Sequence, residues 1–179
     1  MFNFIKQPFI RVSVRYGMIA GVFGFALMIV LYYMNHHPFL VPLFFDFRIL
    51  LFSILIIFCL KEIRDYYQEG FLSFGVAMIA SFIFTVTFGL LCSLLLYLFI
   101  LWNPELVTSF ISLALEQARN ISPDDIEQIG KAAYEELLAN LPTTTGLYLA
   151  RRFFFQSLII SFFLSLIISV VLRRQPKLQ

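Results

Sequence analysis

Long runs of hydrophobic residues, separated by short polar segments, are the main pattern along this chain. Four of the runs are long enough to cross a bilayer, which requires about 20 residues per helix. They occupy residues 16–34, 42–60, 76–101 and 153–172. The third run lies within a longer apolar stretch, residues 71–102, whose start near Gly70 and Gly75 we place at the membrane interface. The pattern predicts an all-α integral membrane protein, residues 1–179 forming a single membrane domain with four transmembrane helices.

Residues 103–150, between the third and fourth runs, follow a different pattern. Asn103, Pro104 and Glu105 have the order of a helix start, in which a capping residue precedes proline and an acid. Residues 122–125 (SPDD) repeat this signal, and apolar residues recur at helical spacing after each start. We predict an extra-cytoplasmic hairpin of two amphipathic helices that folds onto the bundle or the membrane surface. A dedicated partner-binding module is the alternative.

Composition supports the membrane assignment, because 60% of the residues are hydrophobic and only 13% are charged. Soluble domains carry about 25% charged residues. The net charge of +2 is too small to indicate a nucleic-acid partner. Basic residues concentrate on one side of the predicted topology, which places both termini in the cytoplasm by the positive-inside rule. They are Lys6, Arg11, Arg15, Lys61, Arg64, Arg173, Arg174 and Lys177.

Small residues recur every fourth position in three of the four runs. Such spacing forms one ridge on a helix, and small ridges let membrane helices approach closely. We therefore expect the first, third and fourth spans to pack through these ridges, with the second span more peripheral. A hydroxyl-lined path for a solute is the alternative. The ridge residues are Gly17 and Gly21 in the first span, Ala77, Ser81, Thr85 and Gly89 in the third, and Ser157, Ser161, Ser165 and Ser169 in the fourth.

Two ionisable residues, Asp46 and Arg48, lie inside the second run. Two positions apart on a helix, they would point to nearly opposite sides, so each would need its own partner. Arg151 and Arg152 open the fourth run at the same predicted level. We expect these four residues to form an intramembrane charge cluster with a structural role. A proton- or ion-coupled role is the alternative.

Other candidate chemistry is sparse. Cys59 and Cys92 lie in apolar runs without metal-ligand spacing, which favours packing roles. We interpret His36 and His37 as a surface turn. The sequence contains no nucleophile–base pair, phosphate loop or dinucleotide fingerprint, so we predict no catalytic, cofactor-binding or metal site.

Several short stretches resemble a family of small bacterial membrane proteins catalogued as domain of unknown function 4199 (DUF4199), common in Bacteroidota. They are residues 16–21 (YGMIAG), 61–65 (KEIRD), 70–75 (GFLSFG) and 165–169 (SLIIS), followed by Arg173 and Arg174. The resemblance implies a four-helix fold in the bacterial inner membrane and brings no known activity. Asp46 and Arg48 depart from the family pattern.

We therefore expect a multi-pass inner-membrane protein that is not an enzyme. We expect it to be an accessory protein acting through self-association or contact with another membrane protein, with the lipid bilayer as its environment. The alternative is a small solute or ion transporter or channel that acts as an oligomer.

Overall fold

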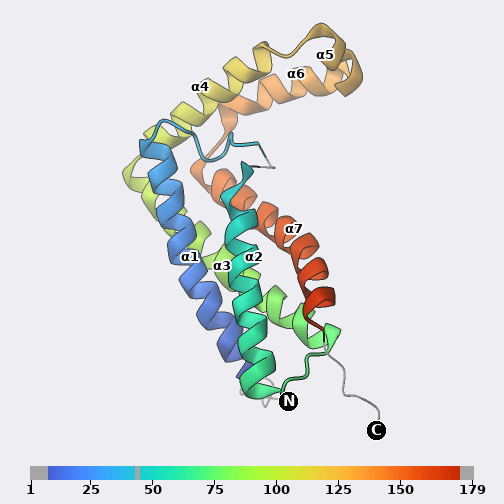
Figure 1. Cartoon of the computed structure of the whole chain (residues 1–179). Helices are drawn as coiled ribbons and strands as arrows, with labels where there is room; N and C mark the ends of the chain where they lie inside the picture. The colour runs from blue at the N-terminus through green and yellow to red at the C-terminus, as the bar shows by residue number, and fades with distance from the viewer. Residues whose placement is uncertain (1–7, 43–44, 174–179) are drawn as a thin grey trace, which may run out of the picture.

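The computed structural model describes residues 8–42 and 45–173, which are helical apart from short connections (Figure 1). Lys6, Arg174 and Lys177 of the predicted basic side lie outside the described residues. Four long helices form a bundle, and a helical layer lies across one end of it. The bundle consists of α1 (Pro8–Tyr33), α2 (Phe47–Glu62), α3 (Phe74–Trp102) and α7 (Gly146–Leu172). The layer consists of α4 (Glu105–Arg119), α5 (Pro123–Ile129) and α6 (Lys131–Asn140).

Short irregular helices complete the chain. A π-helical turn, η2 (Ile63–Tyr67), extends α2, and a 3₁₀ turn, η3 (Leu141–Thr143), joins α6 to α7. Helix α3 is capped by Ser73, whose hydroxyl accepts a hydrogen bond from the Val76 amide at 3.3 Å. Thr145 caps α7 in the same way through the Tyr148 amide at 3.2 Å. These polar caps fix where the two longest helices begin.

Helix α3 is the centre of the bundle and packs along its length against α1 and α7. Helix α2 packs mainly against α1 and α7, opposite α3. Phe52 of α2 meets Phe84 and Phe88 of α3, with ring centroids 5.9 and 4.8 Å apart. All three side chains are fully buried, so aromatic rings fill the middle of the bundle.

Three helices, α1, α3 and α7, are long and apolar enough to cross a membrane. The predicted second span is shorter than expected, because α2 begins at Phe47 and not near residue 42. Its 16 residues would extend about 24 Å, less than a hydrocarbon core of about 30 Å. The late start follows from Asp46, which caps the helix from an extended backbone conformation with φ −67° and ψ 118°.

The segment between α3 and α7 is helical, but it contains three helices where we predicted two. The expected second helix is divided at Gly130, whose φ of 93° lies in the left-handed region. Figure 1 shows α4 leading away from the bundle and α6 returning beside it. The Tyr134 hydroxyl donates to the Ala118 carbonyl at 3.3 Å, which ties α6 to the end of α4.

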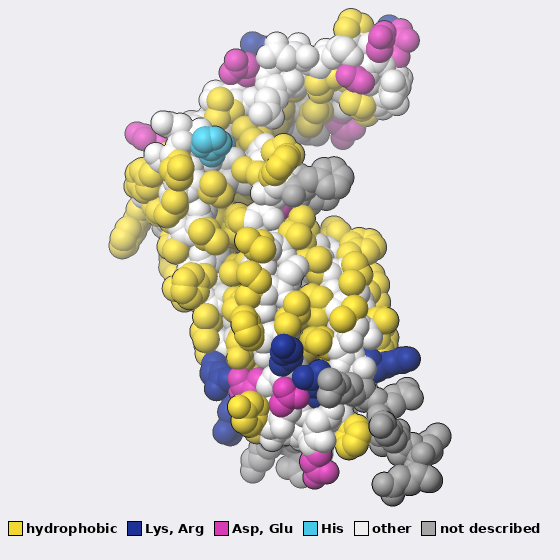
Figure 2. All heavy atoms as spheres, in the orientation of Figure 1, with side chains coloured by type: hydrophobic (Ala, Val, Ile, Leu, Met, Phe, Trp, Pro, Cys, Tyr) yellow, Lys and Arg dark blue, Asp and Glu magenta, His cyan; other side chains and the backbone are white. Residues whose placement is uncertain are grey.

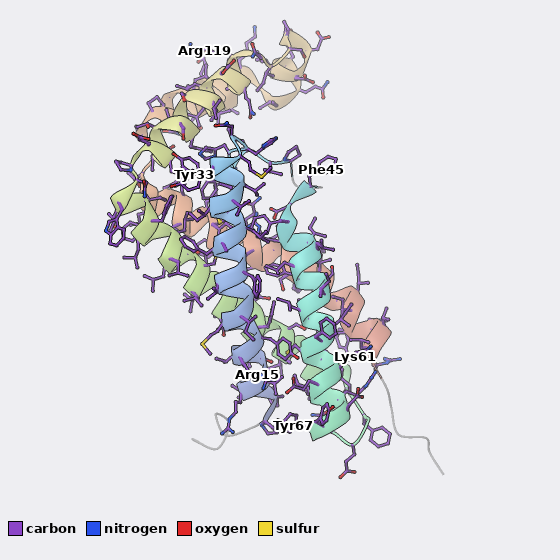
Figure 3. All side chains as sticks on the ribbon, turned by 60° about the vertical axis from the view of Figure 1, so that its left-hand side comes forward. Arg15, Tyr33, Phe45, Lys61, Tyr67 and Arg119 are labelled. Atoms are coloured by element: carbon purple, nitrogen blue, oxygen red, sulfur yellow. The ribbon has the colours of Figure 1, made fainter. Side chains whose placement is uncertain are left out.

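Charged side chains avoid the middle of the bundle. Figure 2 shows an apolar band over its centre, with charged groups below the band and on the α4–α6 layer above it. Arg15, Lys61 and Tyr67 mark the lower end, whereas Tyr33 and Phe45 mark the upper end (Figure 3). The fold therefore has the banded surface that membrane insertion requires.

Candidate functional site

The most distinctive polar site is at the upper end of α2, where Asp46 caps the helix. Its carboxylate accepts a hydrogen bond from the Arg48 amide at 2.9 Å. The same carboxylate accepts from Nε of Arg48, at 2.8 Å to Oδ1 and 2.9 Å to Oδ2, and also from Nη2. The two side chains are only 5% (Arg48) and 9% (Asp46) exposed. Asp46 and Arg48 thus form a buried, multiply bonded ion pair.

The expectation that Asp46 and Arg48 could not satisfy each other is wrong. That expectation assumed that both residues lie within one regular helix. Asp46 instead precedes the first turn, and its capping conformation directs the carboxylate over that turn toward Arg48. A residue two positions away can therefore be its partner, because the opposite-side rule applies only inside the helix.

Arg48 also joins α2 to α7. Its Nη1 donates to the Ser157 hydroxyl at 3.0 Å and to the Phe153 carbonyl at 3.3 Å. Its guanidinium carbon lies 4.6 Å from the centroid of the Phe153 ring, within cation–π range. The Ser157 hydroxyl in turn donates to the Phe153 carbonyl at 2.8 Å. Arg48 thus donates hydrogen bonds both to Asp46 and to α7.

The predicted four-residue charge cluster does not assemble. Among the described residues, neither Arg151 nor Arg152 forms an ion pair with Asp46. Both arginines are exposed, and the guanidinium carbon of Arg152 lies 5.8 Å from the centroid of the Phe110 ring on α4. Asp46 pairs with Arg48 instead.

The serines of α7 occupy four different environments. Ser157 accepts a hydrogen bond from Arg48, and Ser161 forms a hydrogen bond with the Thr85 hydroxyl of α3. Ser165 donates to the Phe162 carbonyl of its own helix at 3.0 Å. Ser169 is buried, and its hydroxyl has no hydrogen-bond partner in the described structure. The regular spacing therefore does not correspond to one shared role.

On α3, Thr85 also donates to the Ser81 carbonyl at 2.9 Å. Because the Thr85 hydroxyl proton is engaged with the Ser81 carbonyl, the Ser161 hydroxyl is the donor in its hydrogen bond with Thr85. The Ser81 hydroxyl is buried without a partner among the described atoms. Ala77 is fully buried. This face of α3 therefore meets α7 with one interhelical hydrogen bond and otherwise by close approach.

Glycines mark the closest approaches of helices. A Cβ atom on Gly17 would lie 2.6 Å from the Phe84 carbonyl oxygen and 2.8 Å from the Thr87 Cβ. A Cβ on Gly21 would lie 3.0 Å from the Leu91 side chain. On α3, a Cβ on Gly89 would lie 2.7 Å from the Phe154 ring of α7. These positions lack space for a side chain because backbone or packed atoms occupy it.

Sequence reasoning missed a buried histidine. His36 is exposed, as expected for a surface turn, but His37 is only 8% exposed. Its Nε2 lies 3.0 Å from the Leu106 carbonyl oxygen, and its ring contacts Phe39 and Phe110. Burial lowers the pKa of His37, and the Leu106 carbonyl opposes that shift only in part. The histidine thus ties the α1–α2 connection to α4, and no local sequence signal distinguishes it from its neighbour.

At the lower end, an ion pair joins α1 to α2. Arg15 Nη2 donates to both carboxylate oxygens of Glu62, at 2.6 and 2.5 Å, and the Tyr16 hydroxyl donates to Glu62 at 3.0 Å. Arg64 pairs with the adjacent Asp65 at 2.6 Å. Figure 3 shows Arg15 at the lower end of the bundle, which is the predicted cytoplasmic side.

A family model for a protein of unknown function, DUF4199, matches residues 15–174 of the chain. The chain belongs to the DUF4199 family. This match confirms the resemblance given by the short motifs, and it covers most of the sequence. No curated protein and no solved structure matches this DUF4199 member.

Within residues 8–42 and 45–173, no three His, Cys, Asp or Glu side chains are grouped to hold a metal ion. Cys59 and Cys92 are buried free thiols, and the Cys59 sulfur lies 3.7 Å from the Ser13 hydroxyl oxygen. The features that stand out in this DUF4199 chain are the Asp46–Arg48–Ser157 connection and the α4–α6 layer.

Proposed function

We propose that this protein is a non-catalytic accessory protein of the bacterial inner membrane, acting by association with another membrane protein. In this proposal α2 crosses the membrane together with α1, α3 and α7, both termini are cytoplasmic, and the α4–α6 layer lies outside the cytoplasm. The lysine and arginine residues near the N-terminus, between the second and third predicted spans and after the last one support this orientation, since they outnumber those of residues 103–152. The bundle is the membrane anchor, and the α4–α6 layer is the surface offered to the partner.

The observation that carries the proposal is the unburied apolar surface of α5 and α6. Neither helix contains a buried residue, although both carry aliphatic side chains. Ile129 is 55% exposed and Leu137 is 44% exposed, and both lie in a layer rich in carboxylates. Helices in proteins are stabilised chiefly by packing of their apolar side chains, so this layer has the properties of a surface that another protein covers.

The interior of the bundle weighs against the transporter alternative. A solute path needs polar groups that face water and are not engaged in internal contacts. Here Arg48 bonds to both Asp46 and Ser157, and Ser161 bonds to Thr85. Buried phenylalanine rings fill the middle of the bundle.

The test is purification of the tagged chain from native membranes in a mild detergent, using the variant Ile129→Glu/Leu137→Glu. Gln128→Glu/Ala139→Glu adds the same charge at exposed positions of the same helices and is the matched control. We expect a stoichiometric partner with the wild type and the control, and its loss with the Ile129/Leu137 variant. A wild-type chain that purifies alone, or equal partner retention by both variants, would contradict the proposal.

The topology has its own test, in a background where Cys59 and Cys92 are replaced by alanine. A cysteine at Glu127 should react with a membrane-impermeant maleimide added to intact spheroplasts. A cysteine at Lys61 should react only after the membrane is permeabilised. The reverse labelling pattern would place the α4–α6 layer in the cytoplasm.

A further inference from the structure

Arg151 and Arg152 are two exposed cations without an acidic partner. All 11 acidic residues of the chain fall within the described residues, and none forms an ion pair with either arginine. The contact of Arg152 with the Phe110 ring orients its guanidinium but does not neutralise it. Two uncompensated charges therefore stand side by side in the first turns of α7.

Their level along α7 is that of the membrane boundary. The two arginines immediately precede the apolar run from Phe153 to Leu172. Figure 1 shows that this end of α7 lies beside the α4–α6 layer, and Arg15 and Lys61 mark the opposite end of the bundle in Figure 3. At this boundary the anionic group most available to an arginine is a phospholipid phosphate.

Arg151 lines three neighbouring surface hollows of different character. The first, about 470 Å³, is the most polar and includes Asn140 and the threonines of residues 143–145. The second, about 410 Å³, includes Arg152, Phe155 and Ile159 on the outer face of α7. The third, about 390 Å³, lies along the seam between α3 and α7 and is almost entirely apolar. Arg151 thus stands where one polar hollow meets two that lead into the apolar band.

The second and third hollows share Phe155, and each could hold a lipid acyl chain along α7. The hollow on the outer face continues, because Ile159 also lines a fourth, apolar hollow of about 440 Å³ that reaches Phe162 and Phe163. From Arg151 to Phe163 the helix rises about 18 Å at about 1.5 Å per residue. That length matches one leaflet of a hydrocarbon core about 30 Å thick.

We propose that this region is a binding site for one anionic diacyl phospholipid. The phosphate lies against Arg151 and Arg152, and a hydroxylated headgroup such as glycerol occupies the threonine-lined hollow. The two acyl chains descend on either side of Phe155. The proposal requires only that the bundle is embedded in a membrane, so it is independent of the accessory role proposed above.

The experiment uses the purified full-length chain in a neutral detergent, offered phosphatidylglycerol and phosphatidylcholine with identical acyl chains. Native mass spectrometry then counts the lipid that stays bound. Each basic residue near a membrane surface contributes roughly a fivefold preference for anionic lipid, so two predict a preference of roughly 30-fold. We expect the wild type to retain one phosphatidylglycerol molecule and Arg151→Gln/Arg152→Gln to lose that preference.

The control Arg119→Gln/Lys131→Gln removes the same charge from exposed positions of α4 and α6 and should keep the preference. Arg151→Lys/Arg152→Lys keeps both charges and should also keep most of it. If the glutamine variant does not fold, the wild type in 1 M salt replaces it. There the screening length falls to about 3 Å and the preference must weaken.

Three results would overturn the proposal. The first is a wild type that shows no preference for phosphatidylglycerol over phosphatidylcholine. The Arg119/Lys131 control would lose the preference as fully as the Arg151/Arg152 variant, which would indicate only a general effect of net charge. Inorganic phosphate or glycerol phosphate at millimolar concentration would displace the lipid, which would indicate a site for free phosphate.

Discussion

Arg48 of α2 donates a hydrogen bond of 3.0 Å to the hydroxyl of Ser157 on α7, while Asp46 holds the other side of the same guanidinium. This buried network thus joins a helix cap, the arginine two positions after it, and a serine 109 residues away from that arginine. This relationship fixes α2 against α7 at the upper end. At the lower end, Arg15 and Glu62 fix α2 against α1.

Replacing Asp46 with asparagine should strongly destabilise the protein. The substitution leaves Arg48 buried without a counter-charge, and breaking a buried ion pair in this way costs about 3–5 kcal/mol. Unfolding of the purified chain by denaturing detergent, followed by circular dichroism, measures the loss.

Replacing both residues of the pair tests whether the loss of stability comes from the unpaired charge on Arg48. Asp46→Leu/Arg48→Met removes both charges and should be much more stable than Asp46→Asn alone, because no unpaired charge remains. A single Asp46→Asn variant as stable as the wild type would show that the pair does not stabilise the bundle.

Ser157→Ala should cost more stability than Ser165→Ala. Ser157 accepts a hydrogen bond from a charged group, a class of bond that contributes about 1.5–3 kcal/mol. Ser165 bonds only to a carbonyl in its own helix, and a neutral hydrogen bond of this kind contributes about 0.5–1.5 kcal/mol, so its removal should cost less. Both variants are measured by the same detergent unfolding, and equal losses would contradict the assignment of Ser157 to Arg48.

Gly17→Ala should destabilise the contact between α1 and α3. The new methyl group would lie 2.6 Å from the Phe84 carbonyl oxygen, so the helices would have to separate. Such overpacking typically costs about 1–3 kcal/mol. Gly75→Ala is the matched control, because a Cβ there meets nothing within 4 Å and alanine favours a helix by about 1 kcal/mol over glycine. A stable Gly17→Ala variant would indicate that α1 and α3 are not held at this distance.

Stability should fall in mild acid because of His37. Burial lowers its pKa in the folded protein, so the unfolded chain binds the proton more readily. The contribution of His37 is complete above the unfolded pKa of about 6.5 and is lost as the pH falls from there through the lowered folded pKa. Melting temperatures between pH 7.5 and pH 5 measure the effect.

His37→Gln should remove most of that pH dependence, whereas His36→Gln should leave it, since His36 is exposed. The ring of His37 faces the aromatic rings of Tyr32, Phe39 and Phe110, and no acidic or basic side chain is among these contacts. A pH profile that is the same in the wild type and in His37→Gln would assign the acid sensitivity to other groups.

Three of the membrane-length helices could be predicted from hydropathy, because a run of apolar residues and a backbone that must satisfy its own hydrogen bonds leave few alternatives. The start of α2 could not, since the apolar run continues from residue 42 through Asp46 and Arg48 to residue 60. Gly130 was likewise visible in the sequence, but its left-handed conformation, which divides the predicted second helix of the outer segment, was not.

The sequence by itself determined the class of protein, its family and the apolar centres of α1, α3 and α7, because these depend on local composition and on motifs within single helices. It did not determine where α1 and α7 begin, at Pro8 and Gly146, several residues before the predicted spans. Only the tertiary structure decided that Asp46 pairs with Arg48, that Ser157 receives Arg48, that His37 is buried, and that Arg151 and Arg152 keep uncompensated charges. Each of these depends on which side chains from distant segments share one space, and on how a cap directs its carboxylate. Sequence spacing does not encode these relations.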